Sequence, residues 1–178
     1  GSADLGVVGL DRYYESRLEQ GDTVLIHDGL GFGGSKLVIA VPDSWLDVTT
    51  MADLADVALE FRAKGRDLRI ASKYARLVKR FLNQNGVNYV SMVHVSGGLE
   101  AAPVMGYADI IADITATGTT LRENGLRVLI DGTVIESQSV IVGNGRALAN
   151  YPEKLDLTRQ ILEKIEASER ASKYQRVT

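Results

Sequence analysis

Apolar runs rich in Val, Ile and Leu recur along this chain, and helical patterns lie between several of them. Many of the runs do not alternate with polar residues, which is typical of strands buried on both faces. This arrangement predicts an α/β fold with mainly parallel sheets. The expected strands are residues 5–8, 24–26, 37–41, 68–71, 89–95, 108–112, 126–130, 133–135 and 140–142.

Capping and breaking residues mark where the helices between these strands begin and end. Thr50 begins one helix, because Asp53 follows three residues later in a capping-box-like pair, and Gly65 ends it. Pro152 begins the last and longest helix, since proline suits a first helical turn. The other expected helices are residues 75–85, 100–105 and 121–124. The residues of the last helix that we expect to face inward are Leu155, Ile161, Leu162 and Ile165.

Two glycine-containing segments are interpreted as connections. Asp131 and Gly132 lie between two strand patterns and predict a hairpin turn. The loop 29–34, which reads GLGFGG, is superficially like a dinucleotide-binding fingerprint. That motif needs a helix after it, whereas residues 36–41 have a strand pattern. We therefore interpret the loop as the crossover between two lobes.

Length and charge limit the possible functions. The 178 residues are enough for one sizeable domain or two small lobes. The net charge of −3 argues against a general affinity for nucleic acid or anionic membranes, so any phosphate site must be local. No apolar run approaches the length of a membrane span. The absence of cysteine excludes disulfides, a thiolate nucleophile and Cys-containing metal sites, and it fits a cytoplasmic protein.

The stretch 113–126, which reads DITATGTTLRENGL, is the most informative about function. Asp113 ends a strand pattern, and three threonines surround Gly118 in the turn that follows. Backbone N–H groups and hydroxyls at such a turn can donate hydrogen bonds to a phosphate, and a helix N-terminus adds partial positive charge. The acid four residues upstream suits sugar hydroxyls. The pattern favours a ribose-phosphate site over an ordinary strand–turn–helix with threonine as its N-cap.

Two other predicted strands also end in candidate ligand-binding residues. Lys73 follows one strand, and ligands of open α/β sheets bind outside the carboxyl ends of strands, so it is placed to meet an anion. A solvated lysine is the alternative. Gly97, Gly98 and Glu100 follow the next strand, where the glycines expose amides to a ligand. Glu100 serves equally well as a cap of the helix that follows.

The two histidines, His27 and His94, lie in apolar strand patterns. Neither has partner acids at the spacing of metal ligands. This favours packed or hydrogen-bonded histidines over a metal site or a catalytic base.

Together these loops resemble the catalytic core of the ATP phosphoribosyltransferase family, which performs the first step of histidine biosynthesis. The family's phosphoribosyl loop is similar to residues 113–121, with 122–126 behind them, and the similarity covers nearly the whole chain in the same order. The other stretches that carry the resemblance are residues 3–9, 30–33, 69–74, 97–103 and 106–109.

The resemblance implies a two-lobed fold like that of type II periplasmic binding proteins, with the active site in a cleft between the lobes. Lobe I would hold residues 1–37 and 118–178, and lobe II would be the inserted residues 38–117. Family members begin with a strand and a basic Lys-Gly-Arg-type loop upstream of the position that corresponds to Gly1. The resemblance therefore implies a core that lacks its N-terminal segment, and it leaves open whether this chain is active alone.

The implied reaction transfers the phosphoribosyl group of phosphoribosyl pyrophosphate to N1 of ATP, giving phosphoribosyl-ATP and pyrophosphate. Asp113 and Asp109 would bind ribose hydroxyls and favour positive charge on the sugar ring. The residues that would hold the 5-phosphate are Thr117, Gly118, Thr119, Thr120 and Leu121. The residues that would border the nucleotide are Lys73, Gly97, Gly98, Glu100 and Asp11.

The resemblance also implies a cofactor and partners. Mg²⁺ would be held mainly by the pyrophosphate, so no protein ligands to a metal are predicted. The enzyme would form a dimer or a higher homo-oligomer. Short-form members use a regulatory partner related to histidyl-tRNA synthetase, and long-form members carry a regulatory domain instead. The alternatives to the transferase are a non-catalytic two-lobed module that binds an anion or small ligand, and a truncated regulatory subunit.

Overall fold

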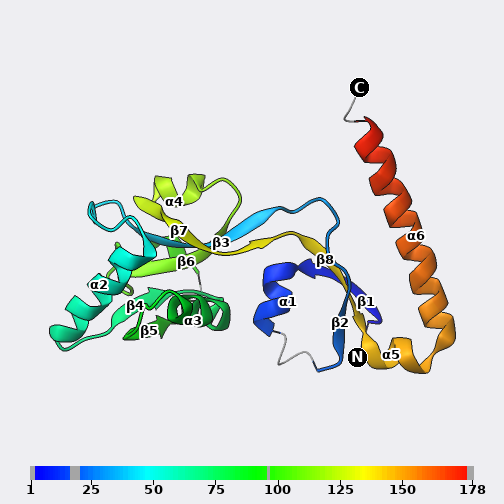
Figure 1. Cartoon of the computed structure of the whole chain (residues 1–178), viewed down its shortest axis with the longest axis horizontal. Helices are drawn as coiled ribbons and strands as arrows, with labels where there is room; N and C mark the ends of the chain where they lie inside the picture. The colour runs from blue at the N-terminus through cyan, green and yellow to red at the C-terminus, as the bar shows by residue number, and fades with distance from the viewer. Residues whose placement is uncertain (1–2, 17–20, 96, 176–178) are drawn as a thin grey trace. The chain divides into compact units, whose positions relative to one another are not determined.

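The computed structural model describes residues 3–16, 21–95 and 97–175, which belong to two compact units (Figure 1). One unit comprises residues 1–34 and 137–178, and the other comprises residues 35–136. Residues 118–136 therefore lie in the middle unit, whereas the sequence assigned them to the lobe formed by the chain ends. The reason is strand pairing, because the strand that begins at Leu126 joins the sheet of the middle unit.

The unit formed by the chain ends contains a three-stranded antiparallel sheet. Its order is β1-β8-β2, so the late strand β8 lies between the two early strands. The strands are β1 (Leu5–Gly9), β2 (Thr23–His27) and β8 (Ser139–Asn144). The helices of this unit are α1 (Leu10–Ser16), α5 (Gly145–Asn150) and α6 (Pro152–Gln175).

The middle unit contains a five-stranded sheet in the order β5-β4-β6-β3-β7. Its strands are β3 (Ser35–Pro42), β4 (Leu68–Ala71), β5 (Val90–Val93), β6 (Ile110–Thr115) and β7 (Leu126–Ser137). Its helices are α2 (Met51–Ala63), α3 (Ala75–Gln84), the short 3₁₀ helix η1 (Leu99–Ala101) and α4 (Thr119–Glu123).

The strand directions correct one prediction, since the sheets are mixed and not mainly parallel. β4 pairs in parallel with both β5 and β6, whereas β3 is antiparallel to β6. The apolar runs without alternation correctly predicted that the strands are buried on both faces of the sheet. Burial on both faces does not fix direction, because an α/β sheet also accommodates antiparallel strands.

Helices cover both faces of the middle sheet, which explains why its strands lack alternation. α2 and α3 supply Leu54 and Val78 to one core, where they pack with Ile39. η1 and α4 supply Leu99 and Leu121 to the core on the other face. All five side chains are at most 4% exposed. The longer helices α2 and α3 thus cover one face of the sheet, and the shorter helices η1 and α4 cover the other.

The start of α2 confirms the predicted capping box. The hydroxyl of Thr50 accepts a hydrogen bond from the N–H of Asp53, and the Asp53 carboxylate accepts one from the N–H of Thr50. The backbone of Gly65 is left-handed just after the helix, as expected of a residue that ends it.

The predicted hairpin at Asp131 and Gly132 is wrong, because β7 continues through both residues. The Asp131 carboxylate accepts a hydrogen bond from the N–H of Met51 at 2.8 Å and so ties β7 to the start of α2. A Cβ on Gly132 would lie 3.2 Å from the carbonyl oxygen of Ile39. The glycine therefore permits close approach to the neighbouring strand and does not form a turn.

The last helix begins at Pro152, as predicted, but its apolar residues are less buried than expected. Leu155 and Ile161 are each 37% exposed, and Thr158 is the buried residue of this stretch. In the part of the chain that the structure describes, no helix is long and apolar enough to cross a membrane.

Candidate functional site

Three loops of the middle unit meet at one edge of its sheet. β5, β4 and β6 are neighbours and run in the same direction, so their carboxyl ends lie at the same edge. The loops that follow them begin at residues 94, 72 and 116, and these loops together with the starts of η1 and α4 contain most of the predicted site residues. Ligands of open α/β sheets bind at this kind of edge. The structure therefore brings together residues that are more than forty positions apart in the sequence.

Ser72 fixes the end of β4 against the end of β6. Its side chain is 3% exposed, and its hydroxyl donates a hydrogen bond to the carbonyl oxygen of Ala112 at 2.7 Å. The same hydroxyl accepts a hydrogen bond from the N–H of Tyr74 at 3.0 Å. These two bonds hold the exposed Lys73 at the edge of the sheet, next to the strand that carries Asp113.

Asp113 is half-buried near the end of β6, on the face of the sheet that η1 and α4 cover. Burial raises the pKa of its carboxyl group above the usual value, because desolvation disfavours the charged form. The N–H of Ile114 and the charge of Lys73 oppose this rise in pKa, and the charge of Glu100 adds to it. Asp113, Lys73 and Glu100 therefore act on one another electrostatically, as members of one site.

The threonine loop has a defined internal geometry. Gly118 is the N-cap of α4, its backbone is left-handed, and its N–H donates to the hydroxyl of Thr115 at 2.8 Å. The hydroxyl oxygens of Thr117 and Thr119 lie 2.9 Å apart, and both side chains are exposed. Since a glycine and not a threonine caps α4, these hydroxyls are placed at the surface of the loop, where they can bind a ligand.

The other two residues predicted for the 5-phosphate differ from each other. Thr120 is exposed, but Leu121 is 4% exposed and packs in the core beneath α4. The backbone of Leu121 can serve a ligand, and its side chain holds the helix against the sheet. α4 itself has only five residues, so its dipole adds less positive charge than the sequence led us to expect.

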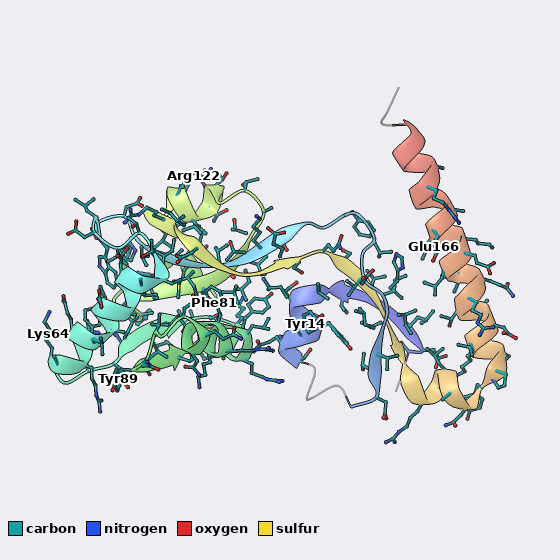
Figure 2. All side chains as sticks on the ribbon, viewed as in Figure 1. Tyr14, Lys64, Phe81, Tyr89, Arg122 and Glu166 are labelled. Atoms are coloured by element: carbon teal, nitrogen blue, oxygen red, sulfur yellow. The ribbon has the colours of Figure 1, made fainter. Side chains whose placement is uncertain are left out.

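Arg122 supplies the positive charge that the short helix does not. Arg122 lies on α4 (Figure 2). Its guanidinium donates to the carbonyl oxygen of Thr117 and to the hydroxyl of Thr119, each at 3.2 Å. Sequence reasoning gave this residue no role. Its position three residues after Thr119 on a helix was the available signal, because side chains at that spacing share a face.

Asp109 lies at the opposite end of β6 from Asp113, before the strand begins. Because a strand rises about 3.3 Å per residue, the four residues from Asp109 to Asp113 place these two side chains about 13 Å apart along the strand. The Asp109 carboxylate accepts hydrogen bonds from Arg66 and from the N–H of Arg69, both at 2.8 Å, and forms an ion pair with the Arg69 guanidinium. Burial opposes ionisation, but these bonds prevail and hold the pKa of Asp109 below its usual value. Its position and partners indicate a structural ion pair, so we assign it no role in binding ribose.

Asp11 belongs to the other unit, where it is 7% exposed. Its carboxylate accepts a hydrogen bond from the hydroxyl of Ser137, which in turn accepts one from the N–H of Asp11. These contacts lie within its own unit and give no indication of a nucleotide.

The loop after β5 keeps its predicted place at the site edge. Gly97 and Gly98 are exposed, and Gly98 has a left-handed backbone with φ of +58°. η1 follows at once, with Glu100 in its first turn. The helix predicted for residues 100–105 is thus only one 3₁₀ turn followed by turns. His94 is exposed in the same loop, so of the two alternatives that we expected, a packed or a hydrogen-bonded histidine, its exposure argues against the packed one.

The described residues contain no group of three His, Asp or Glu side chains that could hold a metal ion, and the sequence has no cysteine. Asp113 and Glu100 are the carboxylates that act on each other at the site edge.

Comparison with known proteins identifies the family. The model of the family described as HisG, ATP phosphoribosyltransferase, matches residues 1–167. The chain belongs to the ATP phosphoribosyltransferase family. It is 43% identical over 178 residues to the ATP phosphoribosyltransferase of Rhodopseudomonas palustris strain BisB18, covering 99% of this chain and 54% of that protein. It is 49% identical over 152 residues to that of Brucella anthropi, covering 84% of this chain and 66% of the relative. The chain thus spans about half the length of the first of these ATP phosphoribosyltransferases.

Solved structures agree with the family and the fold. The ATP phosphoribosyltransferase complex HisG:HisZ of Thermotoga maritima matches with a TM-score of 0.65 and 27% identity, covering 93% of this chain and 71% of the other. The alkanesulfonate-binding protein SsuA of Xanthomonas axonopodis matches with a TM-score of 0.57 at 19% identity, covering 97% of this chain and 59% of that one. The second likeness shows the fold alone, and it confirms the predicted class of a type II periplasmic-binding-protein-like fold.

Proposed function

We propose that this chain provides the phosphoribosyl-binding site of an ATP phosphoribosyltransferase, which transfers the phosphoribosyl group of phosphoribosyl pyrophosphate (PRPP) to N1 of ATP. The products would be phosphoribosyl-ATP and pyrophosphate, in the first step of histidine biosynthesis. The observation that carries the proposal is the threonine loop. It presents the hydroxyls of Thr117 and Thr119 beside the Arg122 guanidinium, next to the half-buried Asp113. The family assignment favours the transferase over a non-catalytic module.

The chain's own residues would divide the work between phosphate and sugar. The hydroxyls of Thr117 and Thr119 and the amides of Thr119 and Thr120 would donate hydrogen bonds to the 5-phosphate. Gly118, whose N–H is held by the Thr115 hydroxyl, would shape the loop around the phosphate. The Arg122 guanidinium, already held on the loop, would balance the negative charge of that phosphate without further ordering.

Asp113 would accept hydrogen bonds from the ribose hydroxyls. In the reaction, the bond between C1 of ribose and the pyrophosphate oxygen breaks, its electron pair leaves with pyrophosphate, and N1 of adenine forms the new bond to C1. Positive charge develops on the sugar ring meanwhile, and the carboxylate would stabilise it electrostatically. Because Asp113 is half-buried, little water screens this interaction.

The remaining predicted residues complete the proposal. Lys73 would attract a phosphate group of either substrate at the same edge of the sheet. Gly97, Gly98 and Glu100 would border the nucleotide on the far side of Lys73, because β4 lies between β5 and β6.

Mg²⁺ is the cofactor that the reaction implies, and the charges at the site fit an ion held mainly by the substrate. The two carboxylates Asp113 and Glu100 are too few to enclose a cation, and the positive charge of Lys73 acts on the same group. The bound ion would neutralise charge on the pyrophosphate and so make it a better leaving group.

We also propose that the enzyme works as a homo-oligomer in the cytoplasm and that a regulatory subunit binds it. The solved Thermotoga maritima structure is a complex of an ATP phosphoribosyltransferase, HisG, with HisZ, which supports a partner of that kind for this chain.

Substitution of the loop hydroxyls tests the proposed function. The double variant Thr117→Ala with Thr119→Ala should weaken PRPP binding by about 10- to 150-fold in isothermal titration with Mg²⁺. One of the two hydroxyl protons already bonds the other hydroxyl, and the loss of one hydrogen bond to a charged group costs about 1.5–3 kcal/mol. The matched control, Thr117→Ser with Thr119→Ser, keeps both hydroxyls and should bind within about threefold of the unaltered chain. Unchanged affinity in the alanine variant would contradict the assignment of the loop.

The same titration, repeated with ATP present, separates the transferase from a simple binding module. A transferase should form phosphoribosyl-ATP, and its two substrates should affect each other's binding. A module that binds one anion would show neither the product nor any effect of ATP.

A further inference from the structure

One long segment of the middle unit contains basic side chains and no acidic ones. Residues 68–99 contain five Lys or Arg side chains and no Asp or Glu, although the whole chain carries a net charge of −3. Three of the five lie on α3, at positions 76, 79 and 80. We call these residues, Arg76, Lys79 and Arg80, the α3 basic stripe.

The α3 basic stripe lies on the exposed side of an amphipathic helix. Val78 and Leu82 face the core of the sheet and are fully buried, whereas all three cations are exposed. In the part of the chain that the structure describes, no carboxylate forms an ion pair with Lys79 or Arg80. The positive charges of these two side chains are therefore not neutralised by a described carboxylate.

Other cations of the unit are neutralised or engaged. Arg66 and Arg69 form ion pairs with Asp109, and Arg62 pairs with Asp67 at 3.3 Å. Arg122 donates to the threonine loop. Among the described residues, the uncompensated field on this side of the unit thus comes from Lys79 and Arg80 together with Lys73, whose charge already acts on Asp113.

The distance along α3 excludes direct contact between Arg80 and a phosphate at the site edge, but it allows a long-range electrostatic effect. α3 begins two residues after Lys73 and leads away from the site edge. Arg80 follows Lys73 by seven residues, which corresponds to about 10 Å of helix axis. A phosphate bound at the threonine loop and Lys73 would not touch Arg80. It would lie within the Debye length at low ionic strength, which is about 20–30 Å.

We infer that Lys79 and Arg80 of the α3 basic stripe draw polyanionic substrates toward the site by long-range electrostatic attraction, without contacting them. The inference rests on the proposed function, because it supposes that the ligand at this edge is a polyanion such as PRPP. A cluster of like charge beside a site raises the local concentration of an oppositely charged substrate, and salt abolishes the effect. The attraction grows with the charge of the ligand.

Titration of charge variants tests the inference. Lys79→Gln with Arg80→Gln removes two exposed cations from the stripe and leaves every proposed contact residue unchanged. The matched control, Arg159→Gln with Lys164→Gln, removes the same charge from exposed positions on α6 in the other unit. Calorimetry would measure the Kd of PRPP and of ribose 5-phosphate for both variants at low salt (~20 mM) and higher salt (~300 mM).

The stripe variant should bind PRPP about three- to fivefold more weakly than the unaltered chain at low salt. The loss should be smaller for the less charged ribose 5-phosphate, and it should fall below about twofold at the higher salt for both ligands. The control should lose less at either salt. Melting temperatures close to that of the unaltered chain would show that α3 remains folded.

Four results would overturn the inference. Equal losses in the stripe variant and the control would show an effect of net charge alone. A loss that persists at the higher salt would show direct contact. Unchanged affinity in the stripe variant, with PRPP bound normally by the unaltered chain, would refute the stripe and leave the proposed function intact. Failure of the unaltered chain to bind PRPP at either salt would instead refute the proposed function and the inference together.

Discussion

Asp113 is a side chain whose burial costs stability while its charge serves the proposed function. Burial raises its folded-state pKa above the ordinary value of 3.8, so the folded protein binds the proton more tightly than the unfolded chain does. Stability therefore falls as pH rises from 3.8 through the folded-state pKa, and at neutral pH the ionised carboxylate is a net cost. A residue kept in spite of such a cost is a candidate for function.

Asp113→Asn should consequently separate stability from binding. At pH 7 the variant should melt at the same or a higher temperature, and its advantage should vanish below about pH 4, where Asp113 is protonated in both states. Its affinity for PRPP should fall by about 10- to 100-fold, because a charged acceptor of ribose hydroxyls is lost. Thermal melts from pH 3 to 8 and titration calorimetry would measure both. A variant that melts lower at pH 7 and binds PRPP normally would contradict the role assigned to Asp113.

Asp109 should show the opposite behaviour. Asp109→Asn breaks a carboxylate pairing with two arginines and should reduce the free energy of unfolding by about 1–2 kcal/mol. This is less than for a fully buried pair, since both arginines are partly exposed. Denaturant unfolding would measure the loss, and PRPP affinity of the folded protein should not change. Asp67→Asn, which removes the carboxylate of an exposed pair with Arg62, is the matched control and should cost less.

Sequence position identified some of the site side chains and missed others for a physical reason. Asp113 and Lys73 were predictable because they lie near or just after the carboxyl ends of β6 and β4, and neighbouring parallel strands present these ends at one edge. Arg122 was missed because its role depends on two hydrogen bonds that pattern alone does not contain. Asp109 was assigned by resemblance, but its position before β6 places it at the other end of the strand.

Among the helices and strands, α2 shows how a local signal can be sufficient. The Asp53 carboxylate accepts bonds from the N–H of Thr49 and from the hydroxyl and N–H of Thr50, which lower its pKa to about 2. Because the folded-state pKa is lowered, the stabilisation is complete above the ordinary pKa of 3.8 and disappears as pH falls through about 2. The capping residues alone were therefore enough to predict the first turn of α2.

Asp53→Ala should lower the melting temperature at pH 7, and the difference from the unaltered chain should shrink between pH 4 and pH 2. Asp56→Ala is the control, since Asp56 is exposed on the same helix and takes no part in the cap. Circular dichroism melts would compare the two. Equal losses at pH 7, or a difference that persists at pH 2, would show that the cap does not stabilise the helix in this way.

β7 shows where a local signal fails. Asp131 and Gly132 have the composition of a turn, but pairing with β3 keeps the strand extended. Gly132→Ala should reduce the free energy of unfolding by about 1–3 kcal/mol, because the new Cβ would lie 2.8 Å from the Cβ of Leu129. Gly34→Ala, where no atom lies within 4 Å of the new Cβ, should change it little. Chemical denaturation would measure both. Equal stability of the two variants would mean that Gly132 does not make the close approach to Leu129 and Ile39 that its position in β7 requires.

For the chain in its entirety, the sequence indicated a discontinuous plan in which both ends join one unit and the middle forms the other. The resemblance implied crossings near residues 37 and 118, whereas the units divide after residues 34 and 136. The second crossing comes later because β7 pairs with β3 in the sheet of the middle unit. The threonine loop therefore belongs to the middle unit, with Lys73 and the loop that follows β5.

The central claim is that the threonine loop binds the phosphoribosyl group, and amide chemical shifts measured by NMR test it most directly. The ¹⁵N-labelled chain would be titrated with PRPP and Mg²⁺. The largest shifts should fall on the amides of Gly118, Thr119 and Thr120, with smaller ones at Lys73 and Gly98. Saturable shifts confined to other parts of the chain, or none in a folded protein, would contradict the claim.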